Sequence, residues 1–287
     1  MSAAAFLALA AAACFAAALI LTQYGLRTMP SWRSPLYSIC GSAILAWVLA
    51  IFFVDPATFQ AKAALIFAGV GIVFPVVVSI LAVRSNEHLG PAVAGAVGNV
   101  TPLFAVLGAV LFLGESLTLG QMAGLALVIA GIALLALRRG TGGRRWPVWV
   151  LLLPLGAAVI RGAIQPAIKT GLTLWPEPMA ATAIGYAVST VVILCLVGPR
   201  AWREGPADRR GVFWFTGVGL FNGTATFLLY AALGLGSITV VAPLVAIFPL
   251  IAVVMSFFFL REERLPAIGL VGIVVSVGGV IVLLLAR

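Results

Sequence analysis

Charged residues are scarce in this chain of 287 residues. They make up 9% of the sequence and include only eight acids, whereas a soluble domain carries about 25% charged residues. Hydrophobic residues make up 63%. This composition excludes an ordinary soluble protein and indicates a protein of the lipid bilayer. The 31 glycines agree, because close packing of helices in lipid favours small residues.

Histidine and cysteine are almost absent. The single histidine is His88, and the three cysteines, Cys14, Cys40 and Cys195, lie in apolar runs without CxxC spacing. Protein metal sites are built from clusters of such side chains, and disulfide frameworks use an even number of cysteines. We therefore expect no metal, no cofactor and no disulfide framework. The scattered acids cannot assemble a catalytic metal centre either, so we do not expect an enzyme.

Long apolar runs dominate what is present. A spanning helix needs about 20 mostly apolar residues. Loops between such runs are short and leave no room for a soluble domain, which predicts an all-α membrane protein. The first run lacks the basic start of a secretory signal and is expected to be the first span. Ten windows qualify: 3–24, 34–54, 61–83, 89–113, 118–137, 148–170, 178–198, 211–233, 238–260 and 265–286.

The second half of the sequence repeats the first at an offset of 146 to 148 residues. FAGVG at 67–71 matches FTGVG at 215–219, and Pro102 aligns with Pro249. Each copy holds five predicted spans, and because five is odd the second copy enters the membrane from the opposite face. This predicts ten transmembrane helices in a 5+5 inverted repeat around a central cavity, an architecture typical of secondary transporters.

Basic residues mark the two faces of the membrane. The loops after odd-numbered spans hold thirteen arginines, whereas the other side holds three basic residues. Cytoplasmic loops are enriched in Lys and Arg, so both termini are expected on the periplasmic or extracellular side. The net charge of +9 is thus an orientation signal, and we expect no nucleic-acid partner. The expected repeats are 1–137 and 148–287, joined by a basic cytoplasmic linker at 138–147.

One segment carries a family resemblance. In PLFAVLGAVLFLGESLTLGQMAGLALVIAGIALL, residues 102–135, a proline opens a span, LGExLT makes the turn and a glycine-spaced helix follows. This order resembles the end of each repeat in the EamA family of the drug/metabolite transporter superfamily. The second copy keeps Pro249 and Glu263, but Arg261 and Glu262 replace the usual Leu-Gly lead-in.

The resemblance implies a multi-pass protein of the bacterial inner membrane that exports small metabolites such as amino acids, or drug-like molecules. It also implies a central cavity lined mainly by spans 1, 3, 4, 6, 8 and 9, with spans 5 and 10 at the sides. Many relatives carry an arginine near the start of the second span. This chain has LYSICGSAIL at 36–45 instead, so no role for that residue is carried over.

Arg161 lies in the middle of a predicted span, where an arginine costs about 2.5 to 3.5 kcal/mol. No acid lies inside a span to neutralise it. We hypothesise that Arg161 holds a substrate carboxylate, which a guanidinium can bind bidentately, and that Gln165 helps to orient it. The open alternative is that it bonds carbonyls freed by Pro166. Residues spaced by three or four form one small, polar face: Pro154, Ala158, Arg161, Gln165 and Lys169.

Further candidates follow the same spacing argument. The other polar candidates for the cavity are Ser79, Asn99, Thr101, Asn222, Thr226 and Tyr230. Serine and threonine can instead bond their own helix, and the two asparagine amides can instead join neighbouring helices. The candidate hinge or gate residues are Pro75, Pro102, Pro166, Pro249 and His88. For the histidine, a surface position and a proton relay are the alternatives.

These features predict a secondary transporter that exports small metabolites by alternating access, amino acids with bulky or aromatic side chains above all. A zwitterion needs one embedded cation, whereas phosphate calls for more than one. A sugar-phosphate, nucleotide or drug carrier of the same superfamily is the alternative, and a membrane-embedded enzyme is the alternative of another class. The expected partners are the small-molecule substrate and the bilayer. A monomer explains the glycines of spans 5 and 10 as well as a dimer does.

Overall fold

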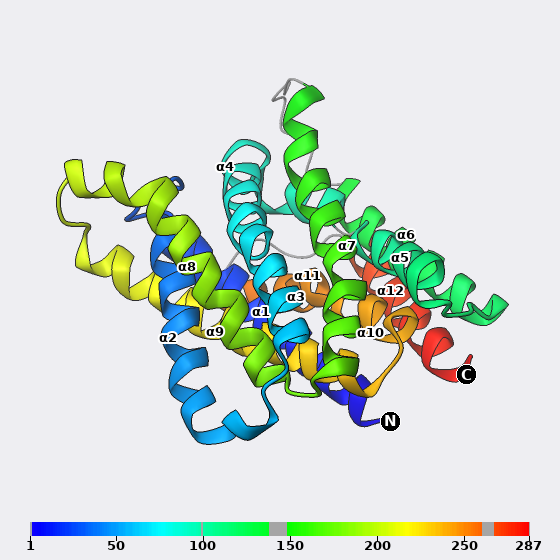
Figure 1. Ribbon diagram of the computed structural model, residues 1–287. Coiled ribbons are helices and arrows are strands. Elements are labelled where there is room, and N and C mark those ends of the chain that lie inside the picture. The colour runs from blue at the N-terminus through cyan, green and yellow to red at the C-terminus, as the bar shows by residue number, and fades with distance from the viewer. Residues whose placement is uncertain (1, 99, 138–147, 260–266, 287) are drawn as a thin grey trace.

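The computed structural model describes residues 2–98, 100–137, 148–259 and 267–286. Within these ranges the chain is helical and contains no strand (Figure 1). The α-helices and two short 3-10 helices (η) are α1 (Ala3–Gly25), α2 (Ser34–Phe53), η1 (Pro56–Thr58), α3 (Ala61–Val73), α4 (Val76–Gly98), α5 (Thr101–Leu113), α6 (Leu119–Leu137), η3 (Val148–Leu151), α7 (Leu152–Leu174), α8 (Pro178–Arg203), α9 (Arg209–Leu235), α10 (Ile238–Val245), α11 (Phe248–Phe259) and α12 (Ala267–Leu285).

Local sequence sets several of these boundaries. The Ser2 side chain accepts a hydrogen bond from the Ala5 N–H and caps α1, and Asp208 caps α9 through the Arg210 N–H. Such caps satisfy N–H groups that have no partner within the helix. At a helix C-terminus, Gly114 ends α5. Its φ of 66° is in the left-handed region, which glycine adopts without steric cost.

Six apolar segments are long enough to cross a bilayer, so the chain is an all-α, multi-pass membrane protein. They are Ala3–Gly25, Ser34–Phe53, Ala61–Ser85, Trp149–Leu174, Pro178–Arg203 and Arg209–Leu235. Three further apolar helical stretches are shorter: Thr101–Leu113, Leu119–Gly131 and Ile238–Ala252. Six of the ten predicted spans thus correspond to long apolar segments, and the count of ten stays a prediction.

The third and fourth predicted spans are divided differently from the expectation. The sequence predicts a turn between residues 83 and 89, but α4 is helical throughout, from Val76 to Gly98. The helix break comes earlier, between Val73 and Val76, where Pro75 lacks the N–H that would continue α3. Hydropathy identifies an apolar run but does not show where a helix is interrupted within it.

The equivalent prolines Pro102 and Pro249 begin helices. Each is the second residue of its helix, α5 or α11, and the preceding helix ends at Gly98 or Val245. Proline is favoured in the first turn because its missing N–H has no helical partner there. These two hinge candidates therefore stand at two helix starts, at equivalent places in the predicted repeats. Their role as hinges stays a prediction.

The loops gather at two ends of the bundle. At one end Arg33 donates hydrogen bonds to the carbonyls of Ala201 and Gly205, which joins the α1–α2 loop to the α8–α9 turn. The Arg200 guanidinium lies 4.2 Å from the ring centre of Trp32 in the same place. We call this the basic end, because its loops and helix ends hold Arg27, Arg33, Arg200, Arg203, Arg209 and Arg210.

The opposite end holds both ends of the described chain. Lys169 Nζ donates to the carbonyl of Gly236, and Ala4 packs against the same glycine. Thr118 Oγ1 donates to the carbonyl of Ala286 at 3.2 Å. We call this the Lys169 end. Since α1 starts and α12 finishes there, the two termini lie at the same end of the bundle.

Helix pairs are exchanged between the two halves of the sequence. Helix α1 of the first half packs along α9 of the second half, and α7 of the second half packs along α4 of the first (Figure 1). Helix α2 packs along α9 while α8 packs along α3, and the last helix of each half, α6 or α12, packs along the other. Neither half therefore builds a core from its own helices alone.

The glycines of the last helices serve a contact within the chain. A Cβ added to Gly279 on α12 would lie 2.7 Å from Val128 N and 2.9 Å from the carbonyl oxygen of Gly124 on α6. Only a residue without a side chain permits this approach of two backbones. Packing inside one chain accounts for these two glycines without a partner subunit.

Another glycine sets the crossing of α2 and α9. A Cβ on Gly219 would press into the carbonyl of Ser38 and lie 3.0 Å from Ser42 N. The Ser42 hydroxyl donates to the Gly219 carbonyl at 2.6 Å, so the crossing is both close and hydrogen-bonded. It places both serines in the wall of the cavity described below.

Replacing Gly219 by alanine should therefore destabilise the protein by about 1–3 kcal/mol, the usual cost of overpacking. Gly217→Ala on the same helix is the matched control, since its Cβ would meet only Leu21 Cδ1 at 3.6 Å. Thermal unfolding in detergent, followed by loss of the monodisperse peak, should show a lower midpoint for Gly219→Ala alone. Equal midpoints for the two variants would contradict the close crossing.

Candidate functional site

A cavity of about 170 Å³ lies among α1, α2, α4, α7, α8 and α9, and the first residues of α5 and α11 also line it. Tyr186 of α8 and Thr226 of α9 lie nearer the opposite end of their helices, but the other lining residues of α1, α2, α7 and α9 come from the middle of these helices or from the part nearer the basic end. They include Thr22 late in α1, Ser38 early in α2 and Pro154 early in α7. The cavity therefore occupies the half of the bundle next to the basic end.

Arg161 contributes the one charged side chain among the described residues that line this cavity. The ion pairs of the described chain are Lys169–Glu115 and Arg200–Glu204, and neither involves Arg161. Its guanidinium also makes no hydrogen bond to another described residue. A cation in an apolar bundle is stabilised by water or by a bound anion, and the cavity offers room for either.

Hydroxyl groups stand in the same cavity. The Tyr186 and Thr226 hydroxyls lie 3.1 Å apart and share a hydrogen bond, and both residues are buried. Ser42 and Asn222 line the cavity as well. A hydroxyl both donates and accepts, and an amide offers two donors and a carbonyl acceptor. These groups can therefore bind an ammonium as well as support a carboxylate.

The remainder of the lining is apolar and aromatic. Rings of Phe15, Phe74, Phe215 and Phe248 line the cavity, and those of Phe15 and Phe248 lie 6.1 Å apart at an angle of 58°. No acidic residue is found among the described residues of the lining. The cavity thus combines one cation, several neutral polar groups and an apolar wall.

Several of the residues predicted from sequence meet in this cavity. Thr101 begins α5, and its hydroxyl bonds the Gly98 carbonyl at 2.7 Å. Arg161 comes from the other half of the sequence, so the cavity lies between the two predicted repeats. The predicted residues that line it are Pro75, Ser79, Thr101, Arg161, Asn222 and Thr226.

The other predicted residues lie elsewhere. Gln165 is 4% exposed and points its Nε2 at the Arg161 carbonyl, 3.5 Å away, so it is not placed to orient a substrate in this conformation. Tyr230 is buried in the apolar core. His88 is exposed on α4 and does not line the cavity, which favours its surface position. Asn99 lies outside the described residues.

The predicted prolines also fall in different places. Pro166 lies inside α7, which continues to Leu174, and its ring packs beside Gly108 of α5. Pro102 is buried at the start of α5. Neither lines the cavity. The helix start of Pro249 is described above, and its side chain lies outside the described part of the structure.

Sequence reasoning missed the contributions of α2 and α8. Ser38, Ser42 and Tyr186 line the cavity, whereas the predicted lining left out the second and seventh spans. A signal was available, because Ser34, Ser38 and Ser42 recur every four residues and so share one face of a helix. These spans hold no charged or amide residue near their centre, and the family resemblance implied a lining by other spans.

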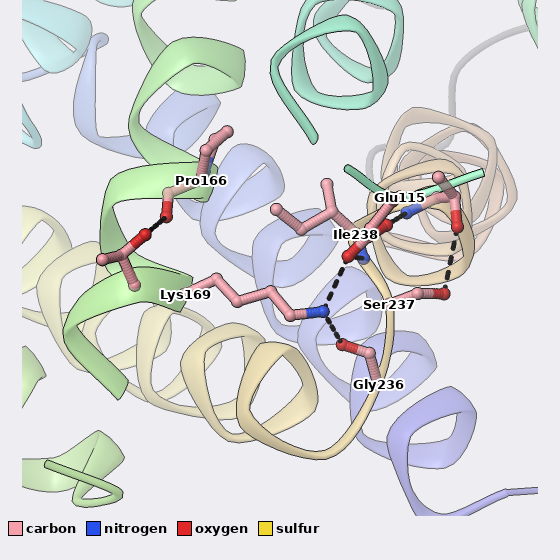
Figure 2. A network of polar contacts seen from close by, with 8 residues as sticks. Glu115, Pro166, Lys169, Gly236, Ser237 and Ile238 are labelled. Carbon is pink, nitrogen blue, oxygen red and sulfur yellow. Dashed lines mark hydrogen bonds and ion pairs between the residues drawn. The ribbon is translucent and has the colours of Figure 1, made fainter. Parts of the chain in front are cut away.

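A second polar cluster lies at the Lys169 end (Figure 2). Lys169 Nζ lies 2.7 Å from Glu115 Oε1 and 2.8 Å from the Gly236 carbonyl oxygen. Both carboxylate oxygens of Glu115 also accept backbone N–H groups, from Ile238 and Thr239, at 3.0 Å each. The carboxylate therefore caps α10 while it neutralises Lys169.

This environment keeps Glu115 ionised. Burial raises the pKa of Glu115, but the hydrogen bonds from Lys169, Ile238 and Thr239 and the charge of Lys169 together bring that pKa below its ordinary value. A carboxyl group with a lowered pKa stabilises the folded state at neutral pH, and this contribution is lost as the pH falls through the lowered value. The LGExLT turn located Glu115 in the sequence but gave no indication of its partner.

A packed apolar core separates this cluster from the cavity. Along α1, α7 and α9 the cavity lining stops at Phe15, Arg161 and Thr226. Beyond these positions, toward the Lys169 end, the side chains that face the interior of the bundle form a buried apolar cluster. Core residues with at most 1% exposure include Ala5, Ala8, Phe67, Ile168, Leu233 and Ile238.

Comparison with known proteins finds a related sequence, a similar structure and a matching family. A protein of Streptantibioticus cattleyicolor named a probable terminal-alkyne amino-acid exporter is 29% identical over 198 residues, which is 68% of this chain and 65% of that protein. The chain thus spans just under two thirds of that relative's length. A crystal structure of another protein superimposes with a TM-score of 0.82 at 18% identity, over 100% of this chain and 98% of that one, which shows the fold alone. The EamA-like transporter family matches residues 2–137 and again residues 148–285. The chain therefore belongs to the EamA-like transporter family.

Proposed function

We propose that this chain is a secondary transporter of the bacterial inner membrane that exports amino acids with bulky apolar or aromatic side chains by alternating access. The observation that carries the proposal is Arg161, the one charged side chain among the described residues of the cavity. A guanidinium presents two parallel N–H donors to a carboxylate. The substrate carboxylate then supplies the anion that the described protein residues do not.

The rest of the cavity suits the remainder of an amino acid. The hydroxyls of Tyr186 and Thr226 and the amide oxygen of Asn222 can accept hydrogen bonds from an ammonium group. The four phenylalanine rings offer an apolar surface to the side chain. A volume of about 170 Å³ is small beside the ~300–1,000 Å³ of drug-sized sites, which favours an amino acid over a drug.

Two observations favour an amino acid over a sugar phosphate or nucleotide. Phosphate carries more negative charge than one carboxylate, yet Arg161 is the one cation in the described lining. Lys169, the next basic residue on α7, is occupied by Glu115 at 2.7 Å. The Streptantibioticus cattleyicolor relative, which is named a probable terminal-alkyne amino-acid exporter, supports the same substrate class.

The ten-span inverted repeat is part of this proposal. Support comes from the two family matches, the exchanged helix pairs and the two termini at one end of the bundle. With the basic end in the cytoplasm, as the excess of arginine indicates, the cavity lies on the cytoplasmic side and the packed core lies toward the outside. This arrangement is one of the two states that alternating access requires.

Arg161 can be tested in proteoliposomes by counterflow of radiolabelled leucine. Arg161→Gln should raise the KM for leucine about 30-fold or more, because removing one partner of a desolvated charge pair costs at least ~2 kcal/mol. Arg161→Lys should retain part of the affinity. Gln165→Ala is the control, since Gln165 does not line the cavity. An unchanged KM in Arg161→Gln would remove the carboxylate role.

The orientation can be tested by labelling single cysteines in intact cells after Cys14, Cys40 and Cys195 are replaced by alanine. Ser116→Cys at the Lys169 end should react with an impermeant maleimide from outside. Pro206→Cys at the basic end should react only after the membrane is permeabilised. Both residues are exposed. The reverse pattern would contradict the proposed orientation.

The prolines at the two helix starts can be tested in the same labelling assay. Ser79→Cys, in the cavity wall, reports the access of reagent from each side of the membrane. Pro102→Ala and Pro249→Ala should shift this access in opposite directions, because inverted repeats place the two helix starts toward opposite faces. Identical labelling rates in both variants and in the parent protein would show that neither proline controls access.

A further inference from the structure

The Lys169 end contains a complete set of donors for one carboxylate. An ammonium and two backbone N–H groups converge on it, from Lys169, Ile238 and Thr239. In this conformation the group that they hold is the side chain of Glu115 (Figure 2). A cation combined with the N–H groups at a helix start is a favourable environment for any carboxylate.

The ammonium of this set, Lys169, lies on α7, the helix that also carries Arg161. The two basic residues are eight positions apart, roughly 12 Å along a helix that rises ~1.5 Å per residue, and Gln165 lies midway at spacings of four. Lys169 is the next cation that a carboxylate leaving Arg161 meets on α7 toward the Lys169 end. Any substrate exported in that direction has to pass the packed core and then this cluster.

Separating Lys169 from Glu115 costs free energy. The side chains of Lys169 and Glu115 are only 22% and 13% exposed, and breaking a partly buried pair leaves both charges and the two N–H groups without partners. Exchange of one carboxylate for another avoids this penalty at Lys169. Glu115 can be hydrated instead, because its turn is at the surface and both Gly114 and Ser116 are exposed.

We propose that Lys169 and the N–H groups of Ile238 and Thr239 form a second carboxylate site, which Glu115 occupies in the present conformation and the substrate carboxylate takes during exit. This inference rests on the proposed export of amino acids. Glu115 then acts as an internal competitor that keeps the Lys169 end closed until a substrate replaces it. The lowered pKa of Glu115 keeps the competitor anionic at neutral pH, so that one anion replaces another.

Leucine counterflow in proteoliposomes of known orientation tests the second site, with leucine varied on the Lys169 side. Glu115→Gln should lower the half-saturating leucine concentration on that side about tenfold, because an amide competes poorly for an ammonium. Lys169→Gln should raise it about tenfold. The controls at the same end are Glu177→Gln and Lys62→Gln, which should leave it unchanged. Inhibition by leucinol, which has no carboxylate, should be equal in all variants.

The charge-reversed double variant, Glu115→Lys with Lys169→Glu, separates a binding site from a structural ion pair. It keeps the attraction between the two positions but removes the cation from position 169, so the half-saturating concentration should rise as in Lys169→Gln. A wild-type value in this double variant would overturn the second site, and so would a wild-type value in Glu115→Gln. If Glu115→Gln fails to incorporate into membranes, the double variant decides alone.

Failure of this inference can be told apart from failure of the proposed function. Wild-type protein without leucine counterflow, or counterflow that is indifferent to Arg161→Gln, would overturn the proposed function and the second site with it. Counterflow that depends on Arg161 while the Lys169-side values of every variant stay unchanged would overturn the second site alone.

Discussion

The solvation of one guanidinium constrains the whole arrangement. Arg161 lies within an apolar bundle whose described ion pairs do not include it, and a cation there needs water or an anion. The helices accordingly leave a space around it instead of closing upon it, and hydroxyl-bearing residues from α2, α8 and α9 line that space. With a neutral residue at position 161, this half of the bundle would contain no buried charge that favours an open cavity.

The two basic residues of α7 are stabilised in different ways. Arg161 is left available in a cavity, whereas Lys169, two turns further along α7, is neutralised by a carboxylate that also caps a helix. The available cation suits a ligand that comes and goes, and the neutralised cation suits a closed contact. The two cations of α7 therefore differ in their surroundings, one in a cavity and the other in an ion pair.

Sequence reasoning predicted the class of fold, because apolar runs and a repeat follow directly from the needs of a helix in lipid. It also placed Arg161 and Asn222 among the cavity candidates, since a charged or amide group in an apolar run has few other environments. Thr101 and Thr226 were placed there by their spacing from other polar residues, and all four line the cavity. It did not predict the break at Pro75 or the continuous helix through residue 88, which depend on backbone geometry. It missed Tyr186 and the partner of Glu115, because both depend on contacts between segments far apart in the sequence.

The exchanged helix pairs bear on how the chain is made. Ribosomes release the first half before the second, yet α1 finds its main neighbour in α9, and α6 finds its own in α12. A nascent chain therefore dwells in the membrane with small-residue surfaces, such as the alanines of α1, turned toward lipid or toward the insertion machinery. The contact between α6 and α12 can form only after α12 has been synthesised, so a chain that lacks α12 leaves α6 without this neighbour.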